Sequence, residues 1–191
     1  MSFELAPTTA YVFMLVFSRI GTMVMLMPAL GEFSVSMRVR LTLAVLISMV
    51  LMPLVADSYG AMPSSLSGIA WGVMSEIAVG FLIGSVARLL MSSLQVAGTI
   101  IAFQTGLAFA QNVDPTQGIQ SALVGSFLSV LAVTMIFATD LHFVVIAAMR
   151  DSYVLFQPGA ALPVGDFVET AVGVVAGSFK LAVQIAAPFV V

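Results

Sequence analysis

Residues Gln104–Gln120 read QTGLAFAQNVDPTQGIQ and interrupt an apolar run that has no ionisable residue between Leu89 and Val113. The segment holds four glutamines, one asparagine, one proline and two glycines. In hydrocarbon each backbone group without a partner costs several kcal/mol, so irregular backbone is tolerated only when it is buried in protein or lines a water-filled cavity. Pro115 removes a backbone donor and pushes Asp114 towards an extended conformation. We therefore expect a broken helix or loop here, and we expect it to line a translocation pathway.

The composition around this segment is that of a membrane-associated protein. Of the 191 residues 61% are hydrophobic and only 8% are charged, and the mean hydropathy is +1.16. A soluble domain carries about 25% charged residues. The chain has no cysteine, which excludes disulfides, thiolate metal sites and a cysteine nucleophile. A net charge of -3 with six basic residues gives no footprint for nucleic acid.

Five long apolar segments predict an all-α fold of membrane-associated helical hairpins, with broken helices near Pro28, Pro53 and the polar segment. We expect the helices at roughly residues 7–27, 41–56, 69–98, 120–149 and from 166 onward. The first reaches the ~20 residues that a bilayer-spanning helix needs, whereas the second is short. The chain stops inside an apolar run, so residues 1–191 are expected to form a single, C-terminally truncated helical domain.

Two pairs of glycines predict close helix packing. Gly80 and Gly84 lie four residues apart, as do Gly173 and Gly177. Small residues at this spacing let helix backbones approach in lipid, where no hydrophobic driving force brings helices together. Each pair is expected to lie against another helix, and the sequence does not identify that helix.

Six ionisable residues fall inside apolar segments, where such residues are rare and functional by default: Arg19, Glu76, Arg88, Asp140, His142 and Lys180. We favour the interpretation that they are buried charges that pair with one another or with charges of partner subunits. The alternative is a proton-coupled or small-solute transporter that uses Glu76, Asp140 and His142 as a proton relay. Asp140 and His142 are two residues apart, so on a helix they would point to different faces.

No pattern in the chain predicts enzymatic chemistry. A lone histidine without cysteine does not make a plausible transition-metal site, and there is no G-x-S-x-G nucleophile motif. A phosphate loop requires a basic residue after its glycines, and the glycines near the polar segment are not followed by one. We therefore expect no catalytic residue, no cofactor and no metal site.

Three stretches, in the same order and together with Arg19, resemble the FliR family. This family provides the inner-membrane export-gate subunit of flagellar type III secretion, and its injectisome counterparts are the SctT proteins. The resembling stretches are MPALGEFSVSMRVRLTLAVLISMVLMP (Met27–Pro53), VAGTIIAFQTGLAFAQNVDP (Val96–Pro115) and ATDLHF (Ala138–Phe143).

The resemblance implies a structural and gating subunit of the type III protein export channel in the bacterial inner membrane, at the flagellar basal body. It implies FliP-like and FliQ-like subunits as partners around a central pore, and FlhB-like and FlhA-like proteins beyond them. The substrates would be exported unfolded proteins, and the helices would be tilted hairpins in contact with membrane lipid and partner subunits. Family members continue into a FliQ-like hairpin, which is absent from this sequence.

The resemblance also implies that the polar segment is a loop that plugs the pore. Gly106 and Gly118 are candidate hinges, and the apolar side chains of residues 107–109 would add a dewetting constriction. The expected plug residues are Gln104, Gly106, Leu107, Phe109, Gln111, Asn112, Asp114 and Gly118. The simpler alternative is a buried connector between two helices.

Overall fold

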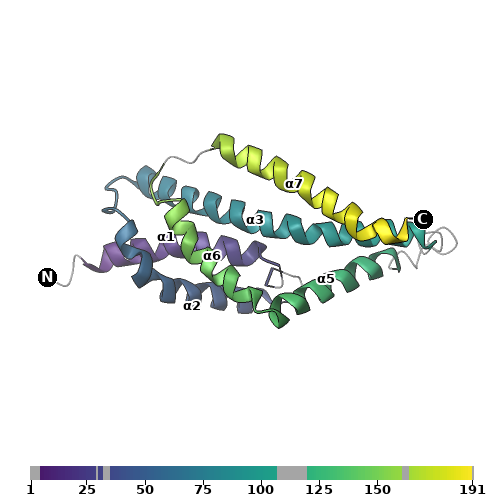
Figure 1. Cartoon of the computed structure of the whole chain (residues 1–191). Helices are drawn as coiled ribbons and strands as arrows, with labels where there is room; N and C mark the ends of the chain where they lie inside the picture. Colours follow the sequence, from purple (N-terminus) through teal and green to yellow (C-terminus); the bar gives the residue numbers. More distant parts are fainter. Residues whose placement is uncertain (1–4, 29, 32–34, 107–119, 161–163, 191) are drawn as a thin grey trace. The chain divides into compact units, whose positions relative to one another are not determined.

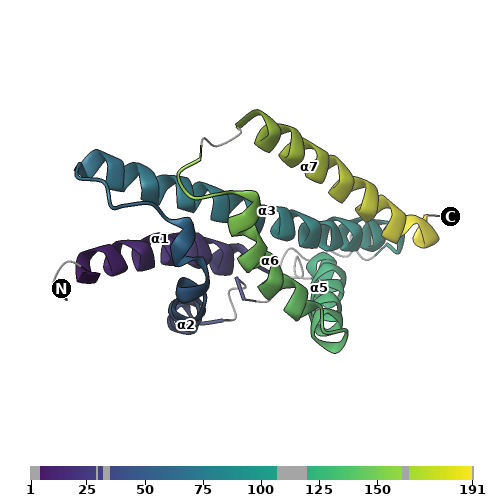
Figure 2. The same cartoon turned by 60° about the vertical axis from the view of Figure 1, so that its left-hand side comes forward.

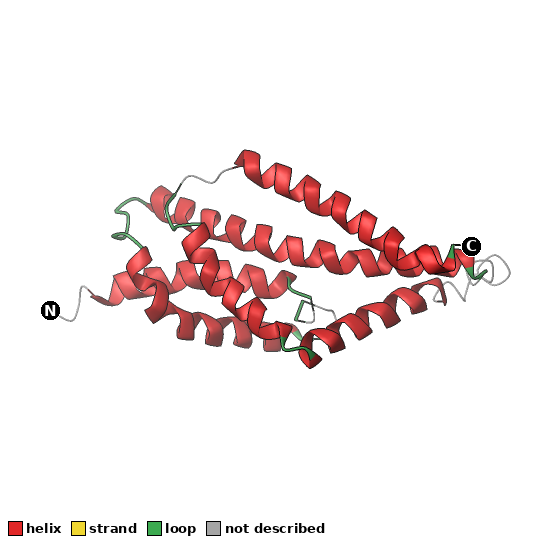
Figure 3. Cartoon of the chain, viewed as in Figure 1, coloured by secondary structure: helices red, strands yellow, loops and turns green. Residues whose placement is uncertain are grey.

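The computed structural model describes residues 5–28, 30–31, 35–106, 120–160 and 164–190, and its regular elements there are all helical (Figure 1; Figure 3). The expected all-α fold is therefore confirmed. The helices are α1 (Leu5–Leu26), α2 (Met37–Val55), α3 (Leu66–Gln104), α5 (Gln120–Ala138), α6 (Leu141–Leu155) and α7 (Val164–Ala186), with short 3-10 turns at Ala56–Ser58 and Ala187–Phe189.

Four helical stretches in the described part of the chain are long and apolar enough to cross a membrane. They are Pro7–Leu26, Met37–Ser58, Leu66–Gln104 and Gly165–Phe189, and α5 and α6 together could provide a fifth across a bent break. The 39 residues of α3 give it a length of about 58 Å. The hydrocarbon core of a bilayer is only about 30 Å thick. This helix therefore needs a strong tilt or a portion outside the hydrocarbon.

The second segment is longer than the sequence indicated. It begins at Met37, because Ser36 caps it by accepting a hydrogen bond from the backbone N–H of Val39. Its 19 residues are close to the ~20 that a span requires. Pro53 lies inside its last turn, and the helix ends two residues later. The prediction of a short second segment was wrong because the two arginines after the cap were assigned to a connector.

The fourth predicted segment is two helices. α5 ends at Ala138 and α6 begins at Leu141, and Asp140 between them has a φ of +58° in the left-handed region. Aspartate is one of the few non-glycine residues that tolerate this conformation. The sequence analysis placed Asp140 inside one helix because apolar residues continue on both sides of the break.

The ends of α1 and α3 lie where breaks were expected. α1 stops at Leu26, just before Pro28, and α3 stops at Gln104. Gly106, with a φ of +77°, donates its backbone N–H to the carbonyl of Phe103. A left-handed glycine after the last turn is a common helix terminator. Residues 107–119 lie outside the described part of the chain.

The chain divides into two compact units, and α3 contributes to both. Unit 1 comprises residues 1–85 and 142–164, and unit 2 comprises residues 86–141 and 165–191. In unit 1, α1 and α2 lie side by side in both views (Figure 1; Figure 2). Each unit is described separately below.

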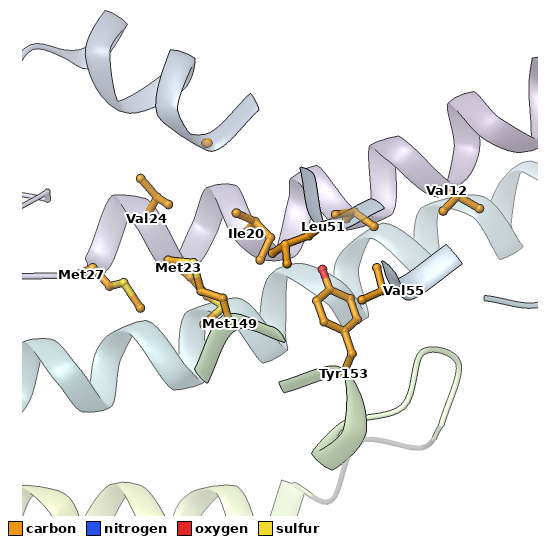
Figure 4. Close-up of a cluster of buried hydrophobic side chains, with 11 residues drawn as sticks. Val12, Ile20, Met23, Val24, Met27, Leu51, Val55, Met149 and Tyr153 are labelled. Atoms are coloured by element: carbon orange, nitrogen blue, oxygen red, sulfur yellow. The ribbon is translucent and has the colours of Figure 1, made fainter. Parts of the chain in front are cut away.

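The core of unit 1 is built on one face of α1. Its side chains recur at three- and four-residue steps, as expected for a helix with one buried stripe. Side chains of α2 and α6 pack against this stripe, with Met149 and Tyr153 coming from α6 (Figure 4). The cluster consists of Val12, Val16, Ile20, Met23, Val24, Met27, Ala44, Leu51, Val55, Met149 and Tyr153.

The buried residues of unit 2 are mostly small. On α7 they form a stripe at four-residue steps, and on α3 they surround a close approach to α5. Small residues let helix backbones come together where larger side chains would separate them. The buried set is Ser93, Ala97, Gly98, Ile101 and Ala102 of α3, Gly125 of α5, and Ser178, Ala182 and Ala186 of α7.

Candidate functional site

Arg19 of α1 is the centre of a buried polar cluster in unit 1. Its Nε donates to the Glu76 carboxylate of α3, and both side chains are almost completely buried. Its two terminal nitrogens donate to the carbonyl oxygens of Ser152 and Phe156, each at 3.0 Å. The guanidinium carbon lies 4.2 Å from the centre of the Tyr153 ring. One side chain thus joins α1, α3 and the C-terminal end of α6.

The position of Arg19 suits the end of a helix. The carbonyl of Ser152 already accepts the backbone N–H of Phe156 at 2.9 Å, so Arg19 uses the second lone pair of that oxygen. The C-terminal end of the helix dipole also favours a cation. Arginine is also the side chain best suited to a buried pair, because its planar fork donates in several directions. The arrangement therefore compensates a charge that would be costly to bury alone.

Tyr59, in the connection after α2, extends the cluster. Its ring meets that of Tyr153 edge-on, with 6.2 Å between ring centres and 66° between ring planes. Burial raises the pKa of the Tyr59 phenol, and the nearby Tyr153 and Glu76 side chains add to this effect. Tyr59 is therefore neutral at physiological pH and contributes packing to the cluster without adding charge.

The glycine face of α3 lies against α1. A Cβ atom at Gly80 would collide with the backbone carbonyl of Arg19 and stand 3.1 Å from Cβ of Thr22. At Gly84 it would stand 2.7 Å from Cβ of Leu26. The contacts advance together along both helices, so α1 and the first part of α3 run parallel. Only a residue without a side chain permits this separation at Gly80.

A second close crossing, between α3 and α5, lies in unit 2. A Cβ atom at Gly98 would overlap the backbone of Gly125, and one at Gly125 would overlap the side-chain oxygen of Gln95. Gln95 Nε2 donates to Oγ of Ser129 at 2.8 Å. Ser129 Oγ in turn donates to the carbonyl of Gly125 at 2.9 Å. We call these four residues the α3–α5 joint.

The sequence analysis did not identify the joint, although a signal was present. Small residues lie four apart on both helices, at Gly98 and Ala102 of α3 and at Gly125 and Ser129 of α5. Spacing of glycines alone does not reveal this joint, because alanine and serine serve the same purpose in membrane helices.

Residues 10–191 match the family model described as "Bacterial export proteins, family 1". The chain is 47% identical over 181 residues to the flagellar biosynthetic protein FliR of Caulobacter vibrioides, covering 95% of this chain and 72% of that protein. The chain belongs to the FliR family. It is 31% identical over 137 residues to FliR of Pectobacterium carotovorum and 31% identical over 120 residues to FliR of Bacillus subtilis. These matches cover 52% and 46% of those two proteins.

Membership of the FliR family confirms the resemblance stated from the sequence. With the candidate membrane spans, it makes this chain a non-enzymatic membrane component of the flagellar type III export apparatus, in the inner membrane at the basal body.

The six ionisable residues predicted to be buried have different surroundings in this FliR-family chain. Arg19 and Glu76 are buried together. His142 is half-buried, with its ring centre 4.2 Å from that of Phe143. Arg88, Asp140 and Lys180 are exposed on the chain itself. Hydropathy locates a residue along an apolar segment but not on a particular face of the helix, so burial of these three by other chains or lipid stays a prediction.

The glycines of α7 do not pack within the described chain. A Cβ atom at Gly173 or Gly177 would have no described atom within 4 Å. The buried stripe of this helix is instead Ser178, Ala182 and Ala186. Packing of Gly173 and Gly177 against a partner subunit of the FliR-family protein stays a prediction.

Most of the expected plug lies outside the described residues. Gln104 is the exposed last residue of α3, and Gly106 has the left-handed conformation that suits a helix end. Leu107, Phe109, Gln111, Asn112, Asp114 and Gly118 fall in the part that the structure does not describe. The plug in this FliR-family chain therefore remains a prediction from the sequence.

Proposed function

We propose that this chain is a structural and gating subunit of the type III protein export channel of the bacterial flagellum. It assembles with FliP-like and FliQ-like subunits around a central pore, in contact with FlhB-like and FlhA-like proteins, and unfolded protein substrates pass through that pore. The observation that carries the proposal is the family match over residues 10–191.

The exposed apolar surface of the helices supports an assembled state. Contiguous apolar surface of this extent marks an interaction site or a membrane contact. On α5, the exposed large side chains lie on the face away from Gly125 and Ser129, which leaves them to lipid or to other subunits. These side chains are Leu123, Phe127, Val130, Leu131, Met135 and Phe137.

The buried ion pair supports a structural role for Glu76. Its carboxylate accepts a hydrogen bond from Arg19, whose other donors hold the end of α6. A relay carboxylate must exchange protons with neighbouring groups along a path, whereas the Glu76 carboxylate is engaged by an arginine whose other donors hold the end of α6. The pair therefore favours an export-gate subunit over a proton-coupled transporter.

Co-purification tests the proposed assembly. A tagged FliP-like subunit, expressed with a FliQ-like subunit and this chain, is expected to retain the chain through purification in mild detergent. An untagged FliP-like subunit controls for adsorption to the resin. Complexes of the FliP-like and FliQ-like subunits that consistently lack the chain would contradict the proposal.

Deleting part of the polar segment between Gly106 and Gly118 tests the plug. If this segment closes the pore, assembled complexes that carry the deletion are expected to leak ions and small solutes at rest. The measurement is dye or ion flux in cells or in reconstituted complexes, with assembly followed by co-purification. Loss of assembly without a leak favours the connector, and survival of both assembly and the resting seal contradicts the plug.

A further inference from the structure

The α3–α5 joint brings two helix backbones into direct contact. A Cβ atom at Gly98 would overlap the backbone of Gly125, and one at Gly125 would overlap the end of the Gln95 side chain and stand 3.3 Å from Gln95 Cα. Both glycines are buried. Contact at this distance leaves no space for water or lipid between the helices, and it favours dispersion contacts along both backbones.

A polar pair reinforces the joint beside this contact. The Gln95 amide bonds to the Ser129 hydroxyl, and that hydroxyl also bonds back to its own helix at the carbonyl of Gly125. Within α3, the Thr99 hydroxyl donates to the backbone carbonyl of Gln95 at 2.9 Å. In an apolar environment few competing partners exist for these groups, so the interhelical bond resists separation of the helices.

The joint lies close to the ends of both helices. Gly98 is six residues before the last residue of α3, Gln104, and Gly125 is five residues after the first residue of α5, Gln120. The separation of α3 and α5 near these ends is therefore set by a backbone contact that neither helix can adjust by changing a rotamer.

We infer that the α3–α5 joint stays closed during export, so that α3 and α5 move as one rigid hairpin and their separation at this point is not part of channel opening. The residues of the joint act as positioning residues, because they fix the separation of α3 and α5. This inference rests on the proposed function, because it specifies which helix movement the gate does not use. The competing mechanism is that the two helices part at Gly98 and Gly125 to admit a substrate.

Crosslinking distinguishes the two mechanisms. The natural chain has no cysteine, so Gln95→Cys combined with Ser129→Cys provides a unique pair within it. Complexes assembled in cells that lack the chromosomal copy are treated with a short bifunctional thiol reagent that can be cleaved. The crosslink is expected to form in nearly all assembled complexes, and secretion of a flagellar substrate by the crosslinked double variant is expected to equal that of the same variant before treatment. Arrest of secretion that is reversed by cleavage would overturn the inference, and so would failure of the pair to crosslink.

Controls separate the joint from general damage. Each single-cysteine variant receives the same reagent, which reports any effect of thiol modification alone. If the unmodified chain does not enter complexes with the FliP-like and FliQ-like subunits, the proposed function fails. In that case crosslinking of the purified chain in detergent still tests whether the joint exists.

A compensating substitution tests the contact itself. Gly125→Ala places a methyl group against the end of the Gln95 side chain, which can move, so it is expected to reduce the yield of assembled complex less than Gly98→Ala. Adding Gln95→Ala to Gly125→Ala is expected to restore that yield to the level of Gln95→Ala alone. Gly98→Ala meets backbone atoms and is expected to show no rescue by Gln95→Ala. Gly165→Ala, at a glycine with open surroundings, is the matched control. Wild-type yield of Gly98→Ala would overturn the inference.

Discussion

Replacement of Glu76 by glutamine is expected to lower the free energy of unfolding by about 3–5 kcal/mol, because it leaves the buried Arg19 guanidinium without its counter-charge. The carboxylate is the group to which Arg19 Nε donates, and both side chains are buried. The measurement is denaturant-induced or thermal unfolding of the purified protein in detergent, together with its level in membranes.

The exposed carboxylate of Glu169 on α7 provides the control. Glu169→Gln makes the same chemical change at a solvent-accessible position, and changes at such positions usually stay within about 0.5 kcal/mol. Arg19→Met alone leaves the Glu76 carboxylate buried without a counter-charge, and Arg19→Met combined with Glu76→Met lacks that charge. Both variants lose the bonds from Arg19 to Ser152 and Phe156, so the double variant is expected to be more stable than Arg19→Met alone. A double variant that is less stable than Arg19→Met alone would contradict a cost from the unpaired carboxylate.

Substitutions at Gly80 and at Gly84 are both expected to destabilise the protein. An alanine at Gly80 meets the main-chain carbonyl of Arg19, and an alanine at Gly84 meets Cβ of Leu26, so in either case α1 itself has to shift. Overpacking of this kind costs about 1–3 kcal/mol. Leucine or phenylalanine at either position is expected to prevent close approach of α1 and α3 and to abolish assembly before any change in gating appears.

Alanine at Gly173 and Gly177 serves as the comparison for unfolding of the isolated chain. No described atom lies within 4 Å of a Cβ at either site, and alanine favours a helix over glycine by about 1 kcal/mol. These variants are expected to unfold no more easily than the unchanged protein.

Co-purification of Gly84→Phe with partner subunits in normal amounts would contradict the prediction that close packing of α3 on α1 is needed for assembly.

Much of the fold could be predicted from local sequence. Apolar length and composition identified a helical membrane protein, and Pro28 and the polar segment marked helix ends that the structure also has. Local signals were missed where a single residue changes the path of the chain. Ser36 extends α2 by capping it, and Asp140 separates α5 from α6 by adopting a left-handed conformation.

For the candidate sites too, the sequence predicted some features and only the tertiary structure decided others. Four-residue spacing indicated that Gly80 and Gly84 share a face, and apolar surroundings indicated that Arg19 and Glu76 need partners. Spacing reports which residues lie together on one helix, because it follows from helical geometry alone. The tertiary structure decided that this face meets α1 and that Arg19 joins Glu76 to the end of α6. It also decided that α3 and α5 meet at Gly98 and Gly125. Which faces meet depends on contacts between residues distant in the chain, and the periodicity of one segment carries no information about those contacts.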